Sequence, residues 1–351
     1  MPFVHETLPQ RVCFAPAGAQ AALTAEVGLL GASRVLVITE TRWAALAEQL
    51  TSGVKTVLQY HEVVMHVPTE VADRARAAAA TCQADAIVSI GGGSTTGLAK
   101  AVALTTGLPI VAVPTTYAGS EATAVWGLTE DGRKTTGVHV AVLPRSIVYD
   151  ATLLRTLPAE LSVASGLNAM AHCVDSLWAP HSDPIDAAFA VEGARALKEG
   201  LPEVAKDPGG VEGIEHALYG AYLAAVAFAS AGSGLHHKIC HVLGGAFNLP
   251  HAETHAVVLP YVLALNAPNA RVADARLAGA FGAESGLAGL QALRATLDAP
   301  RALRDYGFES SDIASAVEAI LPVVPPSNPT PVTAENLQAL LQAAWEGSEP
   351  G

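Results

Sequence analysis

Short apolar segments alternate with helix-like segments through the first 150 residues, and this alternation constrains the fold more than any other feature of the chain. The helix-like segments include residues 41–50 and 69–82. Apolar strands that alternate with helices are typical of a parallel sheet covered on both faces. We therefore predict an α/β domain over residues 1–157. Its strands are expected at residues 34–39, 86–90, 108–113 and 146–149.

The character of the chain changes near Pro158, where strand signals nearly vanish and Ala- and Leu-rich patterns of helical spacing begin. A Pro-rich break at residues 322–331 precedes a last helix that is expected to begin near Thr333. We predict an all-α domain over residues 158–351. The uncharged run at residues 217–235 is predicted to be a buried core helix, because its length is marginal for a membrane span and small residues dominate it.

The charge balance restricts the partners of the chain. Its 351 residues include 33 Asp and Glu but only 20 Lys and Arg, which gives a formal net charge of −13. This excess of acid excludes nucleic acid and anionic membrane surfaces as partners. The four cysteines are widely spaced without a CxxC pair, and the first residues lack the pattern of a signal peptide. Both features predict a cytoplasmic protein.

A glycine-rich loop follows the second predicted strand and precedes a helix. Residues 91–97 read Gly-Gly-Gly-Ser-Thr-Thr-Gly. Backbone N–H groups at a helix N-terminus bind anions, so we predict that this loop holds the diphosphate of a dinucleotide. Gly91, Gly92, Gly93 and Ser94 are the predicted contacts, with Ser94 as the helix cap or a phosphate donor. The competing interpretation is a tight turn without a ligand.

A second loop, at residues 114–123, is dense in hydroxyl groups and follows the next apolar strand. Ligands bind at this end of the strands in open α/β sheets, although hydroxyl residues also favour turns for local reasons. Glu40 ends the first predicted strand, where a carboxylate can accept hydrogen bonds from an adenosine ribose and would repel a 2′-phosphate. It therefore favours NADH over NADPH. The predicted cofactor contacts of this second loop are Thr115, Thr116, Ser120 and Thr123.

Histidines gather in the helical part of the chain. Five of the twelve fall between His236 and His255. His237 and His241 are four residues apart and share one helix face, as do Asn168 and His172 further upstream. One buried histidine is usually a satisfied core residue, whereas several that converge are typical of a metal or acid–base site. We predict such a site from these residues together with His251.

These motifs together resemble the iron-containing alcohol dehydrogenase family over essentially the whole chain. The resemblance rests on the Gly91–Ser94 loop, on Pro114-Thr-Thr with Gly119-Ser-Glu, and on the spacing of His237, His241 and His251. It implies a dehydroquinate synthase-like nucleotide-binding domain, a helical domain, and an active site in the cleft between them. It also implies a cofactor contact at Lys134 and a position near the reacting centre for His241. The family's metal-ligand positions correspond here to Asn168, His172, His237 and His251.

Asn168 departs from the aspartate that is usual at its position. An amide cannot offset a divalent charge, and Fe²⁺ sites usually pair two histidines with a carboxylate. The departure, together with Asn328-Pro-Thr-Pro331, is similar to the maleylacetate reductase branch of the family. That resemblance implies NADH- or NADPH-dependent reduction of 2-maleylacetate to 3-oxoadipate in bacterial aromatic catabolism, by a homodimer and without a metal. The alternative is an iron- or zinc-dependent dehydrogenase of a small alcohol or aldehyde.

The predicted substrate is a small dicarboxylate whose reduction passes through an enolate. Hydrogen-bond donors can stabilise a delocalised enolate. We hypothesise that His172, His237 and His251, with His241 and Asn168, form the catalytic site and that imidazolium groups bind the enolate oxygen and a carboxylate. Asp175 is expected to orient the ring of His172.

Overall fold

The computed structural model describes residues 2–130 and 133–350 and divides the chain into two compact units. One unit is Thr7–Leu157. The other combines the chain from Pro158 onward with the N-terminal residues up to Glu6. His5 joins this second unit through its Nδ1 atom, which lies 2.8 Å from Asp183 Oδ2.

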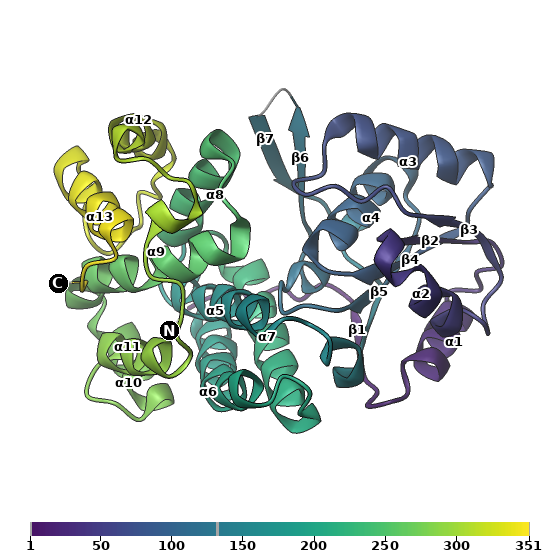
Figure 1. Cartoon of the computed structure of the whole chain (residues 1–351), viewed down its shortest axis with the longest axis horizontal. Helices are drawn as coiled ribbons and strands as arrows, with labels where there is room; N and C mark the ends of the chain where they lie inside the picture. Colours follow the sequence, from purple (N-terminus) through teal and green to yellow (C-terminus); the bar gives the residue numbers. More distant parts are fainter. Residues whose placement is uncertain (1, 131–132, 351) are drawn as a thin grey trace. The chain divides into compact units, whose positions relative to one another are not determined.

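A parallel sheet of six strands forms the α/β unit, in the order β1-β8-β5-β4-β2-β3 (Figure 1). The predicted parallel α/β architecture is therefore confirmed. The four predicted strands are all present and lie next to one another as β8, β5, β4 and β2. The strands are β1 (Arg11–Phe14), β2 (Val35–Thr39), β3 (Thr56–Tyr60), β4 (Ala86–Gly91), β5 (Ile110–Pro114) and β8 (Ser146–Tyr149).

Alternate side chains of the central strands enter two separate hydrophobic cores. Leu36 and Ile38 of β2 pack with α3 and α4, whereas Val35 and Val37 pack with α1 and α2. All four side chains are completely buried, which is why the strand carries an unbroken apolar sequence. The helices on the two faces are α1 (Ala19–Leu29), α2 (Ala44–Leu50), α3 (Thr69–Thr81) and α4 (Gly93–Thr106).

The strands that the sequence pattern missed are the two edge strands and an antiparallel hairpin. Strand β1 is largely exposed and β3 is only half-buried, because each has a neighbour on one side alone. Their residues therefore lack the continuous apolar run of the central strands. The hairpin consists of β6 (Val125–Glu130) and β7 (Arg133–Val138).

The second unit is mostly helical and has no strand among its described residues, in agreement with the predicted all-α class. Its first helices are α5 (Ala159–Ser176), α6 (Pro184–Lys206), α7 (Val211–Ala231), α8 (Leu235–Phe247) and α9 (His251–Asn266). They are followed by α10 (Arg271–Phe281), α11 (Gly286–Thr296), α12 (Ile313–Ile320) and α13 (Ala334–Glu346). Thr333 caps α13, where its side chain accepts a hydrogen bond from the backbone N–H of Asn336. The helix therefore begins where the sequence predicted.

Short 3-10 turns complete the two units. In the α/β unit they are η1 (Thr41–Trp43), η2 (Ser120–Ala122), η3 (Val140–Val142) and η4 (Ala151–Leu154). In the helical unit they are η5 (Ala267–Asn269), η6 (Leu303–Tyr306), η7 (Ser310–Asp312) and η8 (Leu321–Val323).

Small residues let α6 and α7 pack closely. A Cβ atom on Gly200 would lie 2.7 Å from the backbone nitrogen of Ala217, so a larger residue would push the helices apart. The predicted core helix at 217–235 ends earlier, at Ala231, and its interior positions are buried. Among the described residues no single helix is long and apolar enough to span a membrane, although α7 and α8 together, bent by 97°, pass that test of length and composition.

Arg294 donates a hydrogen bond to a backbone carbonyl of α9 that an internal proline leaves without its helical partner. Pro260 has no N–H, so the carbonyl of Ala256 loses its helical partner. The Nη1 atom of Arg294 donates a hydrogen bond to that carbonyl, while Nη2 donates to Pro300 O at 2.7 Å. This support keeps α9 regular beyond His251 and His255.

At the far end of α9, Asn266 and Asn328 exchange two amide hydrogen bonds of 2.9 and 3.0 Å. The Asn328-Pro-Thr-Pro331 motif therefore has a structural role, which is to fix the Pro-rich segment against the end of this helix.

Candidate active site

Helices α5 and α8 bring the predicted histidines together. Asn168 and His172 lie one turn apart on α5, and His237 lies in the first turn of α8. All three are at least nine-tenths buried. The rings of His172 and His237 stack with their centroids 4.9 Å apart. Phe228 of α7 packs against both rings, at 4.8 and 4.3 Å, and gives the pair an apolar wall.

The ring contacts continue from His237 to the other predicted histidines. The centroid of His237 lies 6.0 Å from that of His241 and 4.9 Å from that of His255. His251, the first residue of α9, lies 4.3 Å from His255 and 6.5 Å from His241. The structure thus gathers the four predicted histidines into one cluster. His255 was missed as a member, although its spacing of four residues from His251 on one helix is a usable signal.

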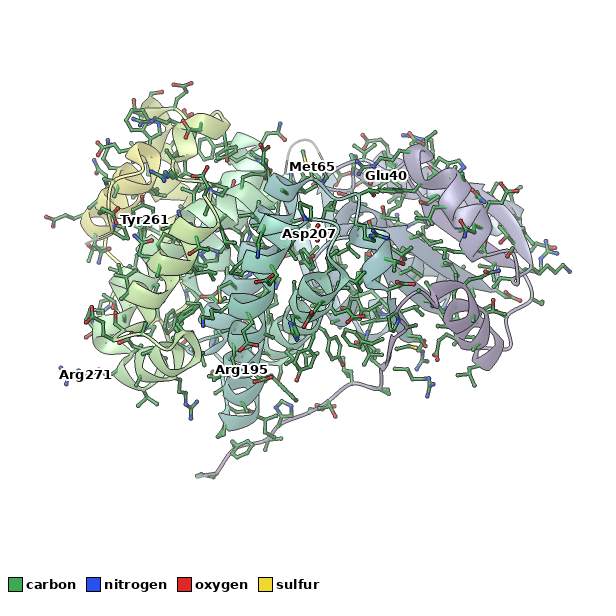
Figure 2. All side chains as sticks on the ribbon, turned by 60° about the horizontal axis from the view of Figure 1, so that its bottom comes forward. Glu40, Met65, Arg195, Asp207, Tyr261 and Arg271 are labelled. Atoms are coloured by element: carbon green, nitrogen blue, oxygen red, sulfur yellow. The ribbon has the colours of Figure 1, made fainter. Side chains whose placement is uncertain are left out.

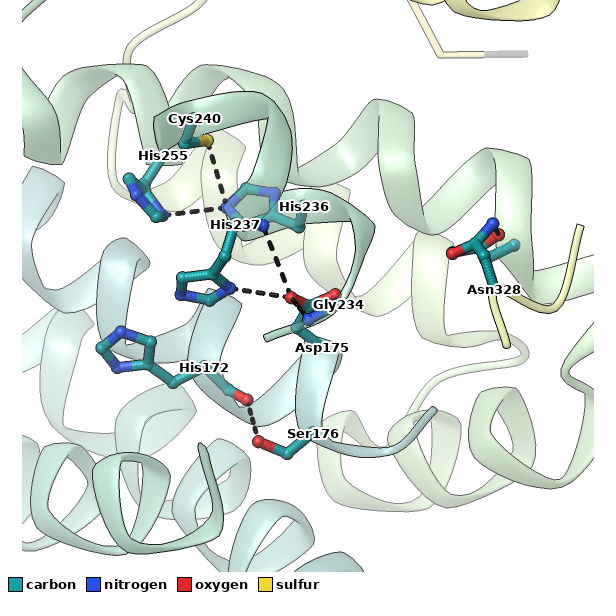
Figure 3. A network of polar contacts seen from close by, with 10 residues as sticks. His172, Asp175, Ser176, Gly234, His236, His237, Cys240, His255 and Asn328 are labelled. Carbon is teal, nitrogen blue, oxygen red and sulfur yellow. Dashed lines mark hydrogen bonds and ion pairs between the residues drawn. The ribbon is translucent and has the colours of Figure 1, made fainter. Parts of the chain in front are cut away.

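Asp175 orients His237 rather than His172, so the expected partner was wrong (Figure 3). Its Oδ2 atom lies 2.8 Å from His237 Nδ1 and also accepts a hydrogen bond of 2.8 Å from the N–H of Gly234. The reason is that the side chain of Asp175 meets the N-terminus of α8, where N–H groups have no helical partner. A Cβ on Gly234 would lie 2.3 Å from Asp175 Oδ1, so this approach requires a glycine. Burial raises the pKa of Asp175 to about 6.

A second polar group lies behind the cluster and joins α8 to α9. His236 Nε2 lies 3.0 Å from His255 Nδ1 and 3.6 Å from Cys240 Sγ (Figure 3). All three side chains are buried, and their potential ligand atoms lie within 4.8 Å of one another. Because these atoms already contact each other, we interpret the group as a brace between the two helices.

The buried imidazoles are held in their neutral form. Burial lowers the pKa of His172 to about 4 and that of His236 to about 3, and it lowers the pKa values of His237 and His255 well below the usual range. Desolvation disfavours the charged form of histidine, which explains the direction of each shift. The hypothesis that imidazolium groups bind the substrate is therefore disfavoured for His172 and His237. Neutral imidazole is instead the form that binds metals.

Several buried polar atoms in the cluster have no hydrogen-bond partner within the described part of the chain. They are Asn168 Oδ1, His172 Nδ1 and His237 Nε2. An unpartnered buried polar atom is costly, so such atoms point to a ligand. A carboxylate that holds one ring nitrogen while the other stays unpartnered is the usual arrangement around a metal-ligating histidine. Asp175 and His237 form that arrangement, and the donor set therefore fits a divalent metal.

The glycine-rich loop has the backbone geometry of an anion site. Gly91 has a φ of +155°, and a Cβ there would lie 2.3 Å from Thr95 Oγ1. Gly92 is the N-cap of α4 and no side chain caps the helix, so the expectation that Ser94 is the cap was wrong. Ser94 lies inside the first turn. The Oγ1 atom of Thr95 is buried and has no partner in the described part of the chain, which adds a hydroxyl that the sequence analysis missed.

The hydroxyl-rich loop packs against the glycine loop. The N–H of Thr115 donates to Gly91 O at 3.1 Å, and the methyl group of Thr116 lies 3.1 Å from where a Cβ on Gly92 would be. The Oγ1 atom of Thr116 is buried and has no partner within residues 2–130 and 133–350, whereas Ser120 is the first residue of η2 and is half-buried.

The hydroxyl of Thr123 differs from that of Thr116 because protein groups already use it fully. It donates to Ser120 O at 3.2 Å and accepts hydrogen bonds from Lys100 Nζ at 3.0 Å and from the N–H of Val125 at 3.3 Å. A hydroxyl has one donor and two acceptor positions, so none remains for a cofactor.

Glu40, which Figure 2 labels, follows the last residue of β2 in the sequence and contacts a neighbour that the sequence analysis did not consider. Arg42 contacts both carboxylate oxygens, with Nε 2.8 Å from Oε2 and Nη2 3.0 Å from Oε1. Lys134, the remaining predicted cofactor contact, belongs to β7, but its side chain lies outside the described residues.

Comparison with known proteins adds family relationships to this geometry. The model of the iron-containing alcohol dehydrogenases matches residues 9–151, and that of the C-terminal part of the Fe-containing alcohol dehydrogenase family matches residues 162–345. Maleylacetate reductase from Sphingobium indicum is 45% identical over 352 residues, which covers 100% of this chain and 99% of the relative. The enzyme of the same name from Burkholderia cepacia is 42% identical and is matched over 99% of both chains.

Two crystal structures show the same fold over the full length. An iron-containing alcohol dehydrogenase from Corynebacterium glutamicum is 58% identical with a TM-score of 0.97, and the match covers 100% of this chain and 98% of that one. Maleylacetate reductase from Agrobacterium tumefaciens is 41% identical with a TM-score of 0.94, and the match covers 100% of both chains.

The expectation of a centre without metal is contradicted by these matches. Both family models that match are those of iron-containing enzymes, which implies a bound iron. The sequence argument gave too much weight to the missing carboxylate at Asn168. It did not foresee that Asp175 would supply a carboxylate behind His237, where it supports a ligand without being one.

Proposed function

Since the chain belongs to the iron-containing alcohol dehydrogenase family and is an oxidoreductase, we propose that it reduces the carbon–carbon double bond of 2-maleylacetate to give 3-oxoadipate, with NADH or NADPH as the reductant. The observation that carries this proposal is the full-length relationship to maleylacetate reductases at 45% identity. The neutral, buried donor set around Asn168 supports it, because a neutral amide adds no negative charge to a site that receives a dicarboxylate.

The chemistry follows from the conjugation of the double bond with a ketone. The nicotinamide, when bound, supplies a hydride, which adds to the alkene carbon β to the ketone. The electron pair of the double bond moves toward the ketone oxygen and gives an enolate. A proton then adds to the α carbon and restores the ketone. Stabilisation of the negative charge on oxygen lowers the barrier to the first step.

Four residues are proposed to hold the iron: Asn168, His172, His237 and His251. Bound there, the iron would supply a Lewis acid that polarises the ketone oxygen. Asp175 accepts a hydrogen bond from His237 Nδ1, so the Nε2 lone pair of that ring stays available to the centre. His241 is only partly buried and lies beside His237, which suits a role as the proton donor.

The cofactor is proposed to bind at the carboxyl ends of β4 and β5. The uncapped N-terminus of α4 would receive the diphosphate, assisted by the hydroxyls of Thr95 and Thr116. Gly91, Gly92, Gly93, Ser94, Thr115 and Ser120 complete the proposed contacts. Glu40 would accept the ribose hydroxyls, which favours NADH as the reductant.

The remaining expectations extend this proposal. The cofactor role of residues 1–157, the catalytic role of residues 158–351 and an active site between them stay predictions. A homodimer is proposed because two-fold symmetry is the commonest arrangement of soluble oligomers. A cytoplasmic location and a part in the bacterial breakdown of aromatic compounds stay predictions.

Steady-state kinetics of the iron-loaded protein test the proposed function. NADH oxidation is followed with 2-maleylacetate and, in parallel, with a series of small aldehydes, and the product is identified by mass spectrometry. We expect 3-oxoadipate and a kcat/KM for 2-maleylacetate at least about 100-fold above that for any aldehyde, a difference of about 2.7 kcal/mol in transition-state binding. A higher kcat/KM with an aldehyde would favour the alcohol dehydrogenase alternative.

A further inference from the structure

A buried lysine lies two turns into the helix that follows the glycine loop. Lys100 is completely buried in α4. Its Nζ atom lies 2.8 Å from Thr123 O, 3.0 Å from Thr123 Oγ1 and 2.8 Å from Val125 O. An ammonium group has three N–H donors, whereas a neutral amine has two. Three acceptors at these distances therefore match the charged form.

The surroundings of Lys100 explain how a charge is tolerated there. Burial lowers its pKa to about 7, and the neighbouring carboxyl of Glu121, itself buried, opposes that shift. The Oε1 atom of Glu121 accepts a hydrogen bond of 2.7 Å from the hydroxyl of Tyr149. Each polar group of this cluster thus has a partner that offsets part of its desolvation.

The segment that Lys100 holds is the hydroxyl-rich loop. The loop is fixed at its start by the bond from the N–H of Thr115 to Gly91 O, and near its end by a bond of 2.9 Å from Gln10 Nε2 to Glu121 O. Lys100 adds the tie that joins the end of the loop to α4. Because α4 begins at the glycine loop, one side chain couples the two loops that carry the proposed cofactor contacts.

We propose that Lys100 is a positioning residue for cofactor binding, which acts by fixing the end of the hydroxyl-rich loop against α4. This inference rests on the proposed function, because it assumes that the two loops bind a nicotinamide cofactor. Thr123, whose hydroxyl is saturated by protein groups, acts with Lys100 as part of the tie and does not contact the cofactor. Lys100 does not contact the cofactor either, since its three N–H groups are all used by protein acceptors.

The test compares NADH affinity in two variants of the same helix. Lys100→Met removes the tie at similar side-chain length. Val102→Ala is the matched control, because Val102 is also completely buried in α4 but packs in the apolar core with α3. The dissociation constant of NADH is measured by fluorescence titration at a temperature where both variants are folded by circular dichroism. Thr123→Val is a milder variant in case Lys100→Met fails to fold, since it removes one of the three acceptors of Lys100.

We expect Lys100→Met to raise the Kd for NADH at least about tenfold, Thr123→Val to raise it about threefold, and Val102→Ala to change it less than about twofold. Equal changes in Lys100→Met and Val102→Ala would overturn the proposal, because they would indicate a general loss of stability. An unchanged Kd in Lys100→Met, or wild-type protein that binds neither NADH nor NADPH, would also overturn it. Wild-type protein that binds NADH but does not reduce 2-maleylacetate would refute the proposed substrate alone.

Discussion

Two polar clusters, one around Lys100 in the α/β unit and one of histidines in the helical unit, are buried in opposite ways. In the α/β unit, the three N–H groups of Lys100 all have acceptors. In the helical unit, Asn168 Oδ1, His172 Nδ1 and His237 Nε2 are buried without a partner among the residues that the structure describes. An unpartnered buried group costs about 1–3 kcal/mol. The difference indicates that a buried cluster whose hydrogen bonds are all made stabilises the fold, whereas a buried cluster with unpartnered atoms marks a site for a ligand.

The largest expected effect comes from the unsatisfied cluster. His237→Ala removes a proposed iron ligand, so kcat/KM should fall about 10³-fold, in line with the several kcal/mol that a Lewis-acid metal contributes. Iron content, measured by mass spectrometry of the purified protein, should fall with it. His216→Ala is the matched control, because His216 is exposed on α7. This variant should retain both its kcat/KM and its iron content. Full iron content in His237→Ala would show that the unpartnered histidine cluster is not the metal site and would contradict the contrast between the two clusters.

The next effect concerns the satisfied cluster. Lys100→Met removes the donor to three acceptors and the positive charge near the buried carboxyl of Glu121, so the free energy of unfolding should fall by about 3 kcal/mol. Urea denaturation measures the change, with Lys55→Met, at an exposed lysine, as the control. A loss below about 0.5 kcal/mol would show that the cluster does not stabilise the unit.

Asp175→Asn should produce a smaller loss, because Asp175 acts through His237. An amide can still accept from Gly234, but it does not fix the charge and tautomer of His237 as a carboxylate does. We expect iron affinity and kcat to fall about 10–100-fold. Metal competition titrations measure the affinity, and Asp298→Asn, at an exposed aspartate, is the control. Unchanged iron affinity would separate Asp175 from the metal site.

The sequence predicts the features of the fold and the site that depend on residues close together in the chain. The central strands are predictable because both their faces are buried, and the histidine pairs because residues four apart share a helix face. The pairing of Asp175 with His237 joins two residues that lie 62 positions apart on different helices, and the hydrogen bond from Lys100 to Thr123 joins a helix to a loop. Such contacts depend on tertiary packing, which periodicity does not encode. The absence of a metal was wrongly expected for the same reason, because the sequence does not reveal that Asp175 supports His237.

The smallest effect tests a satisfied carboxylate of the α/β unit. Glu26 accepts hydrogen bonds from Arg11 at 3.0 Å and from Ser146 at 2.6 Å, and the bond from Arg11 lowers its pKa. A lowered folded-state pKa means that the stabilisation is present above the unfolded value of 4.5 and is lost as pH falls through the folded value. Glu26→Gln should cost about 1 kcal/mol at pH 7 and less in acid. Urea denaturation at pH 7 and at an acid pH below the folded-state pKa of Glu26 checks this. A stability difference between wild type and Glu26→Gln that is the same at the two pH values would contradict the assigned pKa shift.

The position of transferred hydrogen tests the central claim, which is reduction of the double bond, most directly. The iron-loaded enzyme is incubated with 2-maleylacetate and with NADH that carries deuterium at both C4 positions, and the product is examined by NMR. The account predicts 3-oxoadipate with one deuterium on the former alkene carbon β to the ketone, next to the carboxyl group. Deuterium on a newly formed carbinol carbon would show reduction of the ketone and would contradict the account.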